Sequence, residues 1–112
     1  MDLSFTQNVD THTVTILDPT DGYKPTDVTI TVLSANSKEY RQFKAKCTIT
    51  DDDERAVHLL AKATQSWENL EFNGKLKCNY ENAKMLYENS SSVMYQVLKV
   101  YLEDANFMKG KG

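Results

Sequence analysis

The chain has 112 residues, of which 40% are hydrophobic and 26% are charged, an ordinary composition for a soluble globular protein. Its length allows one domain with a modest core. The formal net charge of -3 argues against a nucleic-acid-binding surface, and no apolar run approaches the roughly 18 residues of a membrane span. We therefore expect one domain that binds neither nucleic acid nor membrane.

The N-terminal residues and the cysteines indicate a cytosolic protein. The first ten residues, MDLSFTQNVD, contain two acids and no Lys or Arg, unlike the basic start of a secretory signal. Cys47 and Cys78 are the two cysteines, and a single disulfide is unusual in a chain of this size without an export signal. We expect two reduced, partly buried thiols, with a disulfide between them as the alternative.

Two β-strands are predicted near the start of the chain. Residues 1–11 are polar and unpatterned, which predicts a flexible arm. Residues 12–17 and 27–33 alternate between apolar and polar positions and are rich in β-branched side chains. The nine residues between them, DPTDGYKPT, are typical of a loop, so the two strands should form a β-hairpin.

Two helices are predicted to follow this hairpin. The first begins after Ser37, a suitable cap, and has apolar residues at near-helical spacing. The second opens on four acids at residues 51–54, and its apolar positions predict that it continues to Trp67. The apolar positions of the second helix are Val57, Leu60, Ala61, Thr64 and Trp67.

A second, smaller hairpin and two more helices complete the prediction. Asn73-Gly74 lies between apolar residues, and both residue types readily adopt the positive φ that a type I′ turn requires. A third helix, capped by Asn79, should span residues 80 to about 88. A fourth, capped within residues 90–92, should end near Phe107, and residues 109–112 should form a flexible tail.

This order of elements, β-β-α-α-β-β-α-α, predicts an α+β fold. Residues 12–108 should form a single domain in which the N-terminal β-hairpin and the small Asn-Gly hairpin pack with about four helices.

No catalytic, metal-binding or nucleotide-binding motif is recognisable. The acids at residues 51–54 lack the spaced ligands and central glycine of an EF-hand loop, and acids are common at the positive end of a helix dipole. His12 and His58 do not form an HExxH pattern, Ser90–Ser92 do not form a GxSxG elbow, and neither a GxGxxG nor a Walker A motif occurs. We therefore predict that the protein is not an enzyme and has no catalytic residue, metal or cofactor.

Aromatic and methionine side chains are concentrated in the C-terminal half. Surfaces of this kind suit adaptable binding to another protein, although each residue could instead fill the core. The partner-binding candidates are Trp67, Phe72, Tyr87, Tyr95, Tyr101 and Met108.

Residues 67–87, WENLEFNGKLKCNYENAKMLY, together with the later Ala105-Asn106-Phe107, resemble the tail assembly chaperones of long-tailed bacteriophages and prophages. Residues 28–32 and 37–41 also look like the N-terminal half of such proteins. The features that carry the resemblance in the C-terminal half are Trp67, Phe72-Asn73-Gly74, Leu76, Cys78 and Glu81-Asn82-Ala83.

The resemblance implies a non-enzymatic role in assembly. Such chaperones bind the long helical tape measure protein, keep its apolar surfaces soluble and pass it on as the tail tube protein polymerises around it. They act in the host cell cytoplasm and are absent from the mature virion. Self-association is also expected, because covering a long rod requires many copies. The alternative function is that of a structural subunit, such as a tail completion or head–tail connector protein.

Overall fold

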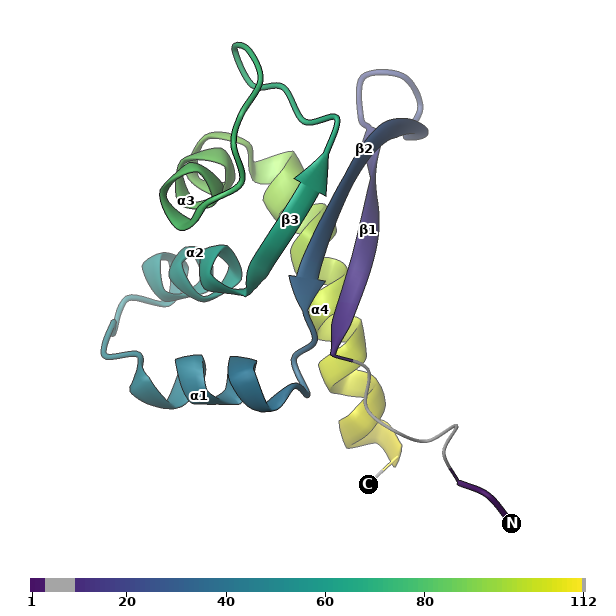
Figure 1. The fold of residues 1–112 in the computed structure, drawn as a ribbon, viewed down its shortest axis with the longest axis vertical. Coiled ribbons are helices and arrows are strands. Elements are labelled where there is room, and N and C mark those ends of the chain that lie inside the picture. The colour runs from purple at the N-terminus through teal and green to yellow at the C-terminus, as the bar shows by residue number, and fades with distance from the viewer. Residues whose placement is uncertain (4–9, 112) are drawn as a thin grey trace.

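The fold consists of a three-stranded antiparallel sheet and four helices (Figure 1). The computed structural model describes residues 1–3 and 10–111, and for residues 102–111 it describes the backbone alone. The strands are β1 (Thr11–Asp18), β2 (Lys24–Leu33) and β3 (Thr64–Glu68), in the order β1-β2-β3. The helices are α1 (Lys38–Lys46), α2 (Asp52–Ala63), α3 (Tyr80–Asn89) and α4 (Ser91–Lys111). The prediction of an α+β fold is confirmed.

The predicted N-terminal hairpin is also confirmed. β1 pairs with β2 in an antiparallel register that places Val14 opposite Ile30, with an irregularity between Thr15 and Leu17. The strands are joined by a turn in which Gly22 and Tyr23 both have positive φ, of 62° and 58°. Because a positive φ is costly for a bulky residue, the position of Tyr23 indicates a backbone held by its surroundings.

The third strand was not predicted. α2 ends at Ala63, and the next five residues lie extended along β2, with Trp67 opposite Ile30. The apolar spacing that suggested a helix as far as Trp67 is also compatible with a helix that ends one turn earlier. Thr and Trp favour extended structure over helix, and pairing with the open edge of β2 supplies the backbone with hydrogen-bond partners.

The predicted Asn-Gly turn is present, but its flanks are not strands. Asn73 and Gly74 have φ values of 61° and 114°, as expected for this dipeptide. The flanking residues form one isolated bridge, between Glu71 and Lys75. Leu70 is buried in the core, so the chain folds back toward the protein instead of extending as a ribbon. An isolated two-stranded ribbon is marginal in water, which explains this outcome.

Helix starts agree closely with the sequence. The Ser37 hydroxyl accepts a hydrogen bond from the Tyr40 N–H and donates one to the Ser34 carbonyl. The Asn79 side chain accepts from the Asn82 N–H, so the caps predicted for α1 and α3 are both confirmed.

The two ends of the chain differ in part from the prediction. α4 extends to Lys111, past the predicted end at Phe107, so it overlaps most of the expected tail at residues 109–112. At the other end, Thr11 belongs to β1, whereas residues 4–9 of the expected arm and Gly112 of the expected tail lie outside the described residues.

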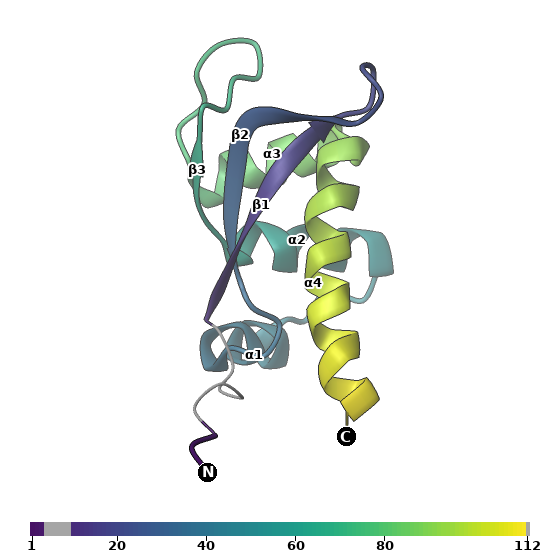
Figure 2. The ribbon, with the colours of Figure 1, turned by 90° about the vertical axis from the view of Figure 1, so that its right-hand side faces the viewer.

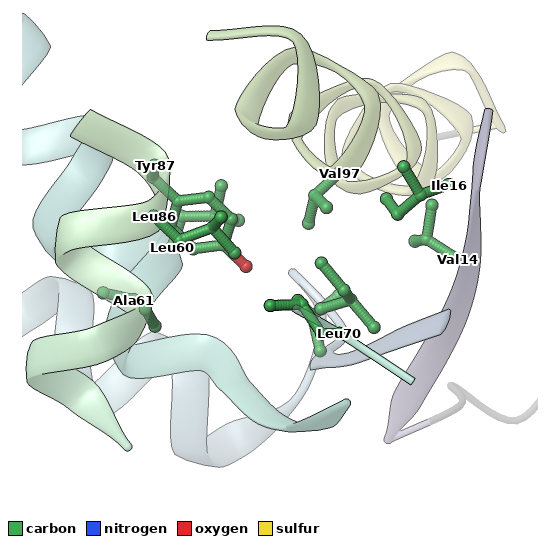
Figure 3. Close-up of a cluster of buried hydrophobic side chains, with 11 residues drawn as sticks. Val14, Ile16, Leu60, Ala61, Leu70, Leu86, Tyr87 and Val97 are labelled. Atoms are coloured by element: carbon green, nitrogen blue, oxygen red, sulfur yellow. The ribbon is translucent and has the colours of Figure 1, made fainter. Parts of the chain in front are cut away.

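The helices α2, α3 and α4 cover one face of the sheet. α4 runs alongside β1, although the two are far apart in the sequence (Figure 2). Figure 3 shows the buried side chains converging from β1, from α4 and from the α2–α3 pair. This cluster consists of Val14, Ile16, Ile30, Val32, Leu60, Ala61, Leu70, Ala83, Leu86, Tyr87 and Val97.

The opposite face of the sheet carries hydroxyl side chains. Thr13 and Thr31 lie on it, with their hydroxyl oxygens 3.0 Å apart, and Thr11 and Thr15 are exposed on the same side of β1. This alternation of apolar and polar positions is that of a sheet packed on one face and solvated on the other.

Candidate partner-binding site

A mainly apolar hollow of about 760 Å³ lies between β1 and the N-terminal half of α4. We call it the β1–α4 groove. The residues that line it include Leu17, Pro19, Tyr23, Tyr95, Gln96, Lys99 and Val100. Concave, largely apolar surfaces with a few polar groups are the usual form of a binding site.

Two tyrosines stand out at this groove because they are exposed. Tyr23 is 61% exposed and Tyr95 is 69% exposed, which makes them the large apolar side chains with the greatest exposure between residues 10 and 101. Tyrosine offers a large contact area together with a hydroxyl that can remain hydrogen-bonded, and it is enriched at protein interfaces for this reason. Burying one such ring against a partner would contribute roughly 1.5–3 kcal/mol.

Gln96 lines the groove and connects its two sides. Its side-chain amide donates to the Leu17 carbonyl over 2.9 Å, and its side-chain oxygen accepts from the Leu17 N–H over 2.7 Å. β1 is an edge strand of the sheet, so this amide occupies the place that a neighbouring strand would take. The two hydrogen bonds tie α4 to β1 and satisfy both backbone groups of Leu17.

The loop that carries Tyr23 is held by its own hydrogen bonds. The Thr20 hydroxyl and the Thr20 N–H both donate to an Asp18 carboxylate oxygen. These bonds lower the pKa of Asp18, with the Thr20 hydroxyl as the larger cause. The Tyr23 N–H donates to the Asp18 carbonyl over 2.8 Å. Tyr23 is thus presented from an ordered turn, which reduces the entropy lost on binding.

The six partner-binding candidates from the sequence are not brought together. Tyr95 lies at the β1–α4 groove. Trp67 and Phe72 are half-buried against the core near the Asn-Gly turn, and the Trp67 indole N–H donates to the Leu76 carbonyl over 2.7 Å. Tyr101 packs edge-on against Tyr40, with ring centroids 4.9 Å apart. The side chain of Met108 lies outside the described residues.

Tyr87 belongs to the core. It is 1% exposed, and burial raises its pKa to about 12. The Thr64 hydroxyl donates its single proton to the Leu60 carbonyl, so the Tyr87 hydroxyl, 2.6 Å away, donates to the Thr64 oxygen. A side chain in this position cannot reach a partner unless the core opens.

Tyr23 was missed by the sequence analysis. The feature of the sequence that could have indicated this residue is its place as a large aromatic side chain within an otherwise polar loop, between Gly22 and the Lys24-Pro25 pair. Such a residue has no periodic neighbours to pack with locally, and loops that carry function often present their side chains in this way.

One histidine makes a close side-chain contact. His58 Nδ1 lies 2.7 Å from the Tyr80 hydroxyl, and Lys62 Nζ lies 5.0 Å from the centre of the Tyr80 ring. The pKa of His58 is lowered first by burial and then by the positive charges of Lys62 and Lys84. This favours a neutral imidazole, and the pair joins α2 to α3 as a packing contact.

The described part of the chain was also compared with the requirements of reactive cysteines, metal sites and membrane-spanning helices. Cys47 and Cys78 are free and half-buried there, and burial raises the pKa of Cys78. Within residues 1–3 and 10–101, no group of three or more His, Cys, Asp or Glu side chains could hold a metal ion. Among the described helices, none is long and apolar enough to cross a membrane.

Comparison with protein-family models, with curated proteins and with solved structures finds no match to this chain.

Proposed function

We propose that this protein is a non-catalytic tail assembly chaperone that binds the tape measure protein of a long-tailed phage or prophage. The observation that carries the proposal is the β1–α4 groove, with two exposed tyrosines at an apolar hollow. The resemblance of residues 67–87 to this family adds the identity of the partner.

The chemistry of the groove suits an amphipathic helix. Such a helix presents apolar side chains at positions i, i+3, i+4 and i+7, which insert as a row into an apolar groove. In this model, α4 forms one wall, so the partner helix would pack beside it at the usual distance of about 8–10 Å. Tyr23 and Tyr95 would pack against the apolar side chains of that helix, and Lys99 would contact its polar edge.

The charge of the chain is compatible with this role. A net charge of -3 keeps the complexes soluble and complements basic segments of a partner. In the proposed model the chaperone acts in the host cell cytoplasm, hands the tape measure protein over as the tail tube protein polymerises, and is absent from the mature virion.

Co-expression with the tape measure protein tests this proposal. We expect the tape measure protein to be insoluble when it is expressed alone and to move largely into the soluble fraction when this chain is present. The reason is that its apolar helix face is then covered. The measurement is the fraction of tape measure protein in the supernatant, with an unrelated acidic protein of similar size as the control.

A second measurement separates the proposed function from that of a structural subunit. Mass spectrometry of purified particles should not detect this chain if it is a chaperone. A fixed number of copies in every particle would instead identify it as a tail completion or connector subunit and would overturn the proposal.

A further inference from the structure

Residues 38–55 carry separated blocks of opposite charge at the surface. α1 exposes four cations and a single acid, whereas the start of α2 exposes four consecutive acids at residues 51–54. Figure 1 shows α1 and α2 side by side and joined by a short loop. The exposed cations of α1 are Lys38, Arg41, Lys44 and Lys46.

The two blocks do not neutralise each other by direct pairing. Within the described part of the chain, none of these eight side chains takes part in an ion pair. The ion pair between Lys24 and Asp21, 3.8 Å long, lies outside both blocks. The acids are favoured at the positive end of the α2 dipole, and the Asp51 side chain accepts from the Glu54 N–H. Each block therefore keeps its charge available to a neighbouring molecule.

A hollow of about 300 Å³ separates the blocks. Its lining includes the charged Lys44, Asp52 and Arg55 together with Tyr40, Leu98 and Tyr101. An apolar centre surrounded by charged side chains is the usual layout of a protein–protein interface. Including Arg55 and Glu39, residues 38–55 carry five cations and five acids, so this surface has no net charge to repel a second copy of itself.

We propose that this surface binds a second copy of the same chain across a two-fold axis. A surface with adjacent positive and negative blocks is complementary to itself after a two-fold rotation, because each block then faces the opposite block of its partner. α1 of one copy lies against residues 51–54 of the other, and the reverse contact forms at the same time. This surface is separate from the β1–α4 groove, so the inference does not depend on the proposed function.

The contact is weak and sensitive to salt. Exposed ion pairs contribute about 0–1 kcal/mol each, so several must act together to hold two copies. The first test is sedimentation of the wild-type chain at about 0.01 M and about 1 M ionic strength, where the screening length falls from about 30 Å to about 3 Å. We expect the dissociation constant of the dimer to rise at least about tenfold. A monomer under both conditions, or a dimer unaffected by salt, overturns the proposal.

Charge reversal gives the sharper test. Lys38→Glu, Arg41→Glu and Lys44→Glu together make both blocks negative, and Asp52→Lys, Asp53→Lys and Glu54→Lys together make both blocks positive. Each triple variant should be monomeric alone, and an equimolar mixture of the two should associate again, because opposite charges then face each other at both contacts. Circular dichroism checks that each variant is folded.

A matched control separates this contact from the effect of net charge. Lys24→Glu, Lys75→Glu and Lys77→Glu together change the net charge by the same amount as the glutamate variant of α1, but on exposed residues near the β1–β2 turn and the Asn-Gly turn. This control should still dimerise alone, and it should associate with the lysine variant more weakly than the glutamate variant of α1 does, because only one of the two contacts then joins opposite charges. If the control pair associates as strongly as the charge-reversed pair, the surface has no specific role and the proposal fails.

Discussion

Replacement of Tyr87 by alanine should lower the free energy of unfolding by about 3–5 kcal/mol, the usual cost of deleting a large aromatic side chain from a core. Tyr87 is 1% exposed and packs in the cluster shown in Figure 3. Small domains are stable by only about 5–15 kcal/mol, so the variant should unfold at much lower urea concentration than the wild type. A loss below about 1 kcal/mol would contradict the burial of this ring.

Tyr87→Phe is the matched control, since it keeps the ring and removes the hydroxyl. It should cost about 0.5–1.5 kcal/mol, because the hydrogen bond to Thr64 is lost while Thr64 still donates to the Leu60 carbonyl. The raised pKa adds a dependence on pH. Unfolded Tyr87 ionises near its ordinary pKa of 10.0, and folded Tyr87 ionises at about 12. Its contribution to stability is therefore full below pH 10.0 and is lost as the pH rises toward about 12; Tyr87→Phe should remove this part of the profile.

Replacement of both Tyr23 and Tyr95 by alanine should have the opposite pattern, with a large effect on binding and little effect on folding. Both side chains are more than 60% exposed, so the free energy of unfolding should change by no more than about 0.5 kcal/mol. If these rings anchor a partner helix, each should contribute about 2 kcal/mol, and their joint loss should weaken binding by at least about a hundredfold. Calorimetric titration with a soluble helical fragment of the tape measure protein measures this.

The control for this pair is Thr13→Ala with Thr31→Ala on the open face of the sheet. These residues also lie at the surface but do not line the groove, and their alanine variants should bind the fragment as the wild type does. If the threonine variants lose binding and the tyrosine variants keep it, the binding surface is the open face of the sheet instead of the groove.

Local features of the fold could be predicted because local chemistry determines them. The caps at Ser37 and Asn79 depend on one side chain and an N–H group three residues later. The positive φ values of Asn73 and Gly74 similarly depend on those two residue types. Alternation of apolar and polar positions in residues 12–17 and 27–33 was sufficient to predict the two N-terminal strands.

The third strand could not be predicted in the same way, because a partner far away in the sequence determines it. Thr64 and Trp67 continue the apolar spacing of α2, and nothing local marks the point at which the helix must end. Their extended conformation follows from the open edge of β2, more than thirty residues earlier in the chain. Tertiary contacts of this kind commonly override local preference.

The candidate site shows the same division between local and distant causes. Tyr87 and Tyr95 are both tyrosines on predicted helices near the C-terminus, and periodicity alone does not separate a core position from an exposed one. Tyr87 is buried because α2 and α3 pack together there, whereas Tyr95 faces outward beside β1. The groove itself combines β1 with α4, which Gln96 joins to Leu17 across 79 positions of the sequence.

A photo-crosslinking experiment tests the central claim, that the β1–α4 groove binds the tape measure protein. Benzoylphenylalanine is introduced in place of Tyr95 in one variant and in place of Thr13 in another, and each is co-expressed with the tape measure protein before irradiation. The groove model predicts a covalent product with the tape measure protein from position 95 and none from position 13. A product from position 13 alone, or from neither position although the two proteins purify together, would contradict it.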